Sequence, residues 1–165
     1  MNTNMTPVDW AKRPLQKYAD FTGRASRSEY WWYILGLIIV AVVLSIVESL
    51  VGVKGMIIGI YGPLTALLWL VTIVPSTAVG ARRLHDTNRS GWWQLLAYIP
   101  YLILLLIRPG AGSALGAVAL AGIVSLIALV CAIVVLVFMC LAGTPGDNRF
   151  GPPPLGENRN TVAAE

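Results

Sequence analysis

The segment WWYILGLIIVAVVLSIVESLV, residues 31–51, decides the fold because Glu48 is its only charged residue. A helix rises about 1.5 Å per residue, so this segment would form a helix about 31 Å long, close to the roughly 30 Å hydrocarbon core of a bilayer. The composition agrees, since 56% of the 165 residues are hydrophobic and only 12% are charged, whereas soluble domains average about 25% charged residues. We therefore predict that lipid surrounds the middle of the chain.

Three more apolar runs follow the first. Residues 56–80 and 113–142 carry no charge, and a shorter run, residues 92–107, ends before Arg108. Trp92 and Trp93 can lie at one membrane interface and Arg108 can extend to the other, so even the short run can cross the bilayer. The connections are brief, which makes neighbouring helices antiparallel. The sequence thus predicts an all-α integral membrane protein, a compact four-transmembrane-helix bundle with spans at about 31–51, 56–80, 92–107 and 115–142.

The distribution of Lys and Arg predicts the orientation of these spans. Bacterial membrane proteins concentrate basic residues in their cytoplasmic loops. Of the twelve Lys and Arg residues, only Lys54 and Arg108 fall on the other side of the predicted spans. Both termini are therefore predicted to be cytoplasmic. The predicted organisation is a cytoplasmic N-terminal segment (residues 1–20) that can lie along the membrane interface, a membrane domain (21–154) and a disordered cytoplasmic tail (155–165).

Three polar segments lie on the predicted cytoplasmic side. In the first, Ser26 and Glu29 have the spacing of a capping box that would stabilise the N-terminus of the first helix. The second, residues 81–93, is predicted to be a short turn whose basic residues suit the dipole of the preceding helix. The third, residues 143–154, is rich in Gly and Pro, which end the fourth helix.

These segments, in this order between four apolar helices, resemble the bacterial inner-membrane family known as domain-of-unknown-function family 805. Pro153 departs from the pattern, because similar proteins often have an acidic residue there. The resemblance covers about Tyr18 to Pro154 and implies a multi-pass protein of the bacterial inner membrane, with no agreed activity. The matching residues are Phe21, Gly23, Arg24, Arg27, Glu29, Tyr30 and Trp31, then Arg82, Arg83, Leu84, His85, Asp86, Arg89, Ser90, Gly91, Trp92 and Trp93, and finally Gly146, Asn148, Phe150, Gly151 and Pro154.

The basic groups of the three segments form a candidate anion site, because the predicted bundle brings them to one membrane level. The planar fork of arginine suits phosphate, so an acidic lipid head group or a phosphorylated small molecule would fit. The predicted function is a non-catalytic binding or accessory protein, with anionic membrane lipids as partners. The candidate binding residues are Arg24, Arg27, Arg82, Arg83, His85, Asp86, Arg89, Asn148 and Arg149, supported by Ser26, Glu29, Trp31, Ser90 and Trp92.

The same residues are compatible with three alternatives to an anion site. Helix capping, dipole matching and positive-inside topology account for most of the charges without a ligand. A transporter of small solutes or lipids would use Glu48, the acid within a predicted span, and so few helices would need a homo-oligomer. His85, Asp86 and Ser90 include the residue types of nucleophilic catalysis, but neighbours on a turn rarely have the required geometry, so no enzyme is predicted. Nor does the sequence predict a cofactor, a metal site or a nucleic-acid partner.

Overall fold

The computed structural model of the protein describes residues 5–53, 62–106 and 114–154, which fold almost entirely into helices. Within these ranges there is no β-strand, and a single bridge pairs Asn148 with Gly151. The prediction of an all-α protein is therefore confirmed. The helices are α1 (Pro7–Gln16), α2 (Arg27–Leu50), α3 (Pro63–Asp86), the short 3-10 helix η1 (Gly91–Gln94), α4 (Leu95–Leu106) and α5 (Ala114–Cys140).

Three of these helices are long and apolar enough to cross a membrane: α2, α3 and the Val118–Cys140 part of α5. The predicted third span is different, since η1 occupies its start and α4 has only 12 residues. Such a helix is about 18 Å long, well short of the roughly 30 Å core of a bilayer. The predicted continuation to residue 107 lies outside the described residues. The described part of the chain therefore contains three spans of full length and one shorter apolar helix.

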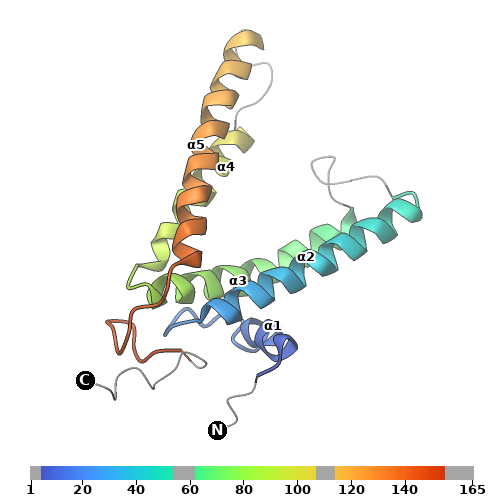
Figure 1. Ribbon diagram of the computed structural model, residues 1–165. Helices are drawn as coiled ribbons and strands as arrows, with labels where there is room; N and C mark the ends of the chain where they lie inside the picture. The colour runs from blue at the N-terminus through green and yellow to red at the C-terminus, as the bar shows by residue number, and fades with distance from the viewer. Residues whose placement is uncertain (1–4, 54–61, 107–113, 155–165) are drawn as a thin grey trace.

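The helices form two hairpins that diverge from one junction (Figure 1). One hairpin consists of α2 and α3, the other of α4 and α5, and α3 meets α5 only where the hairpins join. The compact bundle predicted from the short connections is thus not what the described residues form. A small apolar core lies inside the first hairpin and includes Ala25, Tyr33, Leu37 and Val79. Charged side chains of α3 and of the loop before α2 join the two hairpins.

The second predicted span, residues 56–80, starts outside the described residues, and the helix that follows continues past its predicted end. Helix α3 begins at Pro63, where the missing N–H of proline costs nothing, and continues to Asp86. It ends before Asn88, which adopts a positive φ of 58°. Residues 81–86 therefore form the C-terminal end of helix α3 and are not part of the loop that follows it. The sequence suggests a turn because charged residues usually mark the end of a span, whereas here Arg82, Arg83 and Asp86 are fully buried.

Glu48 connects the end of α2 with the start of α3. Its carboxylate accepts hydrogen bonds from the Thr65 backbone N–H at 3.1 Å and from the Thr65 hydroxyl at 2.7 Å. A further bond comes from the Leu64 N–H. The first N–H groups of a helix have no partner within the helix and carry a partial positive charge, so a carboxylate there is stabilising. This capping role accounts for a buried acid in a membrane span without invoking transport.

We expect Glu48→Gln to lower the stability of the protein by about 1–3 kcal/mol, because the variant loses the charge that meets the α3 N-terminus and weakens its hydrogen bonds. The midpoint of thermal unfolding in detergent micelles, followed by circular dichroism, would show the loss. Ser49→Ala changes the exposed neighbour and is the control. Equal midpoints for the two variants would contradict the capping role.

Helix α1 forms at the N-terminus even though Pro14 lies inside it. Thr6 and Asp9 make a reciprocal capping box, and the hydrogen bonds from Thr6 lower the pKa of the Asp9 carboxyl. The helix packs along α2 and buries Trp10 and Pro14, while Val8 stays exposed. The predicted interfacial segment is thus a helix over residues 7–16, and its place at a membrane surface stays a prediction. The predicted disordered tail, residues 155–165, lies outside the described residues.

Candidate functional site

The three polar segments predicted to meet lie together where the two hairpins join. The Ala25 N–H donates to the carbonyl of Arg82 at 3.0 Å, and the Thr144 N–H donates to the carbonyl of Asp86 at 2.8 Å. The loop before α2 and the loop after α5 are thereby both attached to the last turns of α3. We call this region the junction; it comprises residues 21–30, 81–93 and 143–151.

Asp86 is the centre of the junction. Its side chain is completely buried and accepts a hydrogen bond from Arg24 Nε at 2.9 Å and another from Arg83. Gly143 makes this arrangement possible, because a Cβ at that position would collide with the Asp86 carboxylate. Each of the three charges depends on the others, since a buried charge that loses its partner is strongly destabilising.

Backbone carbonyls accept hydrogen bonds from the other N–H groups of Arg24. Its Nη1 donates to the carbonyl of Gly146 and its Nη2 to that of Thr144, each at 2.6 Å. Gly146 has a φ of +65°, which only glycine adopts readily, so the turn that presents these carbonyls requires glycine. The donors of Arg24 are therefore engaged within the chain.

Arg83 performs a similar task for α5. Its Nε donates to the carbonyl of Met139 at 3.1 Å, and its Nη2 donates to the carbonyl of Leu141. The last carbonyls of a helix lack partners within the helix and carry a partial negative charge. Arg83 thus caps α5 from α3 and joins one hairpin to the other.

A second buried ion pair lies on the α1 side of the junction. Arg82 Nη1 donates to Glu29 Oε1 at 2.6 Å, and Arg13 of α1 lies 3.4 Å from Glu29 Oε2. Ser26 caps α2 as predicted, by accepting the Glu29 N–H at 3.2 Å. The other half of the predicted capping box is not formed, because the Glu29 carboxylate pairs with the two arginines. Sequence reasoning misses the role of Arg13, since nothing in the sequence around it indicates a partner 16 residues further on.

Arg82 differs from the other buried arginines of the junction. Its Nε and Nη2 atoms are buried, and neither donates to any atom of the described residues. Arginine carries five N–H donors, so Arg82 retains several that the chain does not use. An unsatisfied donor attached to a buried charge is costly, which makes this the exceptional polar group of the site.

His85 and Asn148 hold the C-terminal loop against α3. The Asn148 amide donates to the carbonyl of His85 at 2.9 Å, while His85 Nδ1 donates to the carbonyl of Gly23 at 3.1 Å. The imidazole is stacked on Phe150, with ring centroids 3.9 Å apart. Arg149 is exposed; it lies over the same phenyl ring at 4.7 Å and donates to the loop backbone. Phe150 belongs to the family motif, but the motif alone does not predict its contact with the histidine.

The remaining predicted residues lie at the edges of the junction. Arg27 is exposed at the start of α2, and Arg89 lies over the Phe138 ring at 4.3 Å. Ser90 caps the 3-10 helix η1 by accepting the Trp92 N–H. Trp92 is 77% exposed, and Trp31 packs edge-on against its neighbour Tyr30.

The carboxylates outside and inside the junction differ in their surroundings. Hydrogen bonds from the Thr22 hydroxyl and N–H lower the pKa of the exposed Asp20 carboxyl, just before the first loop.

Asp86 does not hydrogen-bond His85, because the aspartate faces the arginines and the histidine faces Gly23. In the described part of the chain no three His, Cys, Asp or Glu residues are grouped as metal ligands would be.

Comparisons of the sequence with known proteins identify the family of this chain. Residues 18–152 match the family model described as "Protein of unknown function (DUF805)". The inner membrane protein YhaH of Escherichia coli is 38% identical over 147 residues, which is 89% of this chain and 97% of YhaH. The inner membrane protein YhaI of the same organism is 33% identical over 153 residues, covering 92% of this chain and all of YhaI.

No solved structure matches the chain significantly. The apolar spans and the inner-membrane relatives agree in describing an integral membrane protein. The resemblance noted in the three polar segments is thereby confirmed, and the junction consists of the segments that carry it. The chain belongs to the DUF805 family of inner-membrane proteins.

Proposed function

We propose that this protein is a non-catalytic binding or accessory protein of the inner membrane whose basic cytoplasmic face binds a phosphate-bearing anion. In this proposal both termini and the junction are cytoplasmic, as the distribution of Lys and Arg indicates. The proposal also takes the short apolar helix α4 as a fourth crossing. The anion is the head group of an acidic lipid or a phosphorylated small molecule, because both present the same oxygen acceptors.

The unsatisfied donors of Arg82 are the observation that carries this proposal. Arg24 and Arg83 are neutralised in part by Asp86 and otherwise by backbone carbonyls. Around Glu29, by contrast, one carboxylate faces the charges of both Arg82 and Arg13, and Arg82 Nε and Nη2 have no acceptor within the described residues. A phosphate oxygen would supply the missing acceptor and balance the excess positive charge.

The position of Arg13 supports access to this cluster. Its side chain is 17% exposed, whereas that of Glu29 is 1% exposed. The cluster therefore reaches the surface beside α1, a helix that carries or adjoins further basic residues, Lys12 and Lys17. Anionic lipid attracts such residues, with about 1 kcal/mol for each Lys or Arg near the membrane surface.

We expect Arg82→Lys to weaken anion binding about tenfold or more while the protein stays folded. Lysine keeps the positive charge beside Glu29 but lacks the fork of N–H groups that would hold a phosphate. Anionic lipid that co-purifies with each variant would be quantified by native mass spectrometry. Arg159→Lys makes the same exchange outside the candidate binding residues and is the matched control.

A titration of lipid-depleted protein separates the two sources of phosphate. Dioctanoyl phosphatidylglycerol is the lipid probe, glycerol phosphate and inorganic phosphate are the soluble probes, and dioctanoyl phosphatidylcholine is the zwitterionic control. Binding of the lipid probe alone identifies a head-group site, and binding of the soluble probes identifies a small-molecule site. If Arg82→Lys retains lipid and binds every probe as the parent protein does, the proposal is wrong.

A further inference from the structure

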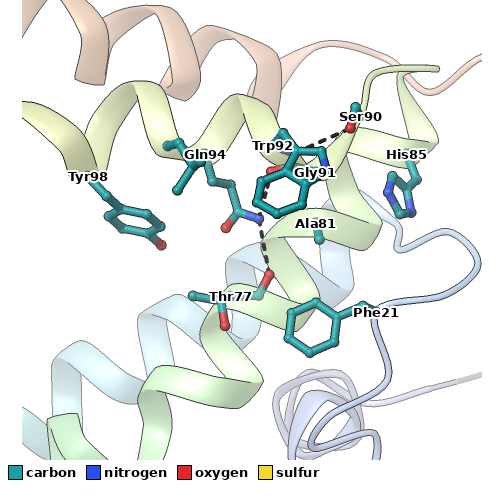
Figure 2. A pocket seen from close by; sticks show the side chains of 10 residues that line it. Phe21, Thr77, Ala81, His85, Ser90, Gly91, Trp92, Gln94 and Tyr98 are labelled. Carbon is teal, nitrogen blue, oxygen red and sulfur yellow. Dashed lines mark hydrogen bonds between the residues drawn. The ribbon is translucent and has the colours of Figure 1, made fainter.

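A cavity of about 440 Å³ lies between α3 and the start of α4, beside the loop before α2 (Figure 2). This volume falls within the range of ordinary small-molecule sites, about 300–1,000 Å³. Thr77 and Ala81 of α3 form one side, and Phe21 of the loop lies opposite Trp92 of η1. No Lys, Arg, Asp or Glu is among the described residues that line it. The cavity is therefore distinct from the Arg82 cluster.

Five polar side chains occur on this otherwise apolar lining: those of Thr77, His85, Ser90, Gln94 and Tyr98. The Thr77 hydroxyl already donates to carbonyls of its own helix. Nδ1 of His85 donates to the carbonyl of Gly23, so in the neutral ring Nε2 is an acceptor, and no described residue donates to it. The hydroxyl of Tyr98 likewise has no hydrogen-bond partner within the described residues. A mostly apolar cavity with a few polar groups is typical of a ligand site.

One of these groups, the Gln94 amide, is held in place by the fold. Its nitrogen donates to the carbonyl of Thr77 at 3.2 Å and to that of Gly91 at 3.3 Å, as Figure 2 shows. Both amide N–H groups are thus engaged, which leaves the side-chain oxygen of Gln94 as an acceptor. Gly80 provides the room for this amide, because a Cβ there would collide with the Gln94 oxygen. Side chains fixed before a ligand arrives lose little conformational freedom on binding.

We propose that this cavity binds an uncharged lipid whose head group carries hydroxyls, such as a monoacylglycerol. The acceptors on His85 and Gln94 suit hydroxyl donors, and the hydroxyls of Ser90 and Tyr98 can donate or accept. A phosphate head group does not fit, since no cation among the described lining residues pairs with it and burying an unpaired charge is costly. The proposal does not depend on the anion site at Arg82.

The position of the cavity along α4 gives the lipid a direction. Ser90 and His85 lie at the end of the cavity nearest the turn between α3 and η1, whereas Leu95 and Tyr98 lie further along the apolar helix α4. A hydroxylated head group would lie between this end and the Tyr98 hydroxyl, and its acyl chain would continue past Leu95 along α4, in the direction of the bilayer core. The head and the tail would thus each meet groups of their own polarity.

Photocrosslinking of the full-length protein in nanodiscs tests the proposal. The probe is a monoacylglycerol with a diazirine in its acyl chain, and the crosslinked residues are identified by mass spectrometry. We expect labelling at or beside Trp92, Leu95 or Tyr98. Unlabelled monoolein should compete, whereas methyl oleate, which has the same chain but no hydroxyl, and dioleoyl phosphatidylglycerol should compete at least tenfold less well.

Two pairs of variants make the test specific. Tyr98→Phe removes one hydroxyl and should weaken competition by monoolein about three- to tenfold, the range expected for one hydrogen bond. Tyr101→Phe makes the same change on the same helix outside the cavity and should have no effect. Leu95→Trp should fill the cavity and abolish labelling there, while Leu102→Trp, two turns further along α4, should not.

Three results would overturn the proposal: labelling spread evenly over α2, α3 and α5, equal competition by methyl oleate and monoolein, or labelling that survives Leu95→Trp. Stronger competition by phosphatidylglycerol than by monoolein would show that the cavity binds an anionic lipid instead, and would also overturn it. Arg82 is not among the described residues that line this cavity, so Arg82→Lys should leave it unchanged. Crosslinking that persists in that variant while lipid retention falls would separate the two sites.

Discussion

Replacing Asp86 with asparagine is expected to lower the free energy of unfolding by about 3–5 kcal/mol, the usual cost of removing one partner from a buried ion pair. Asparagine fills almost the same volume but leaves Arg24 and Arg83 without a counter-charge. Because both side chains are completely buried beside Asp86, water cannot compensate for the loss. The variant would expose the two arginines or unfold the region where the hairpins join.

The measurement is reversible unfolding in mixed detergent micelles, with increasing fractions of dodecyl sulphate and with tryptophan fluorescence as the signal. Asp147→Asn makes the identical chemical change at a less buried position of the C-terminal loop and should alter stability by less than about 0.5 kcal/mol. If both variants unfolded at the same detergent composition, the Asp86 cluster would not hold the fold together.

Glu29→Gln should have an effect of similar size, about 3–5 kcal/mol, on the same scale. Glu29 is 1% exposed and is the counter-charge of both Arg82 and Arg13. Its loss would leave Arg82 buried with unmatched charge and would release α1, which reaches the cluster through Arg13. Limited proteolysis should therefore cut the N-terminal region faster in this variant.

Asp20→Asn provides the comparison for Glu29→Gln. Asp20 forms an ion pair with Lys17 in which both side chains are more than one-third exposed, and exposed pairs contribute only about 0–1 kcal/mol. The proteolysis rate of α1 should stay close to that of the parent protein. An equal increase in both variants would mean that Glu29 does not attach α1 to the rest of the chain.

The long helices could be predicted from the sequence because their signal is local. An apolar run has the length of a bilayer core whatever lies around it, and the helices α2 and α5 lie along the first and the last of these runs. The end of α3 could not be predicted in this way. Its last six residues include Arg82, Arg83 and Asp86, whose partners lie more than 50 residues away, apart from the contact between Arg83 and Asp86.

The candidate site was predictable as a set of segments but not as a set of roles. Family-like motifs indicate that residues from three segments belong together, and the structure brings those segments into contact. Only the three-dimensional arrangement distinguishes Arg82, with its unused donors, from Arg24 and Arg83, since all three are arginines in polar stretches. The cavity beside Gln94 had no sequence signal, because it depends on the approach of Phe21 to α4.

The hydrogen bonds of Arg24 determine when this molecule can finish folding. Arg24 is translated early, but its acceptors at Thr144 and Gly146 follow the last helix. A ribosome that has completed α2 and α3 has therefore inserted a hairpin whose polar end still lacks its final partners. The hydrogen bonds of Arg24 with the C-terminal loop therefore form late in biosynthesis. A chain released before Gly146 would remain in the bilayer as an incompletely folded hairpin, a substrate for membrane quality control.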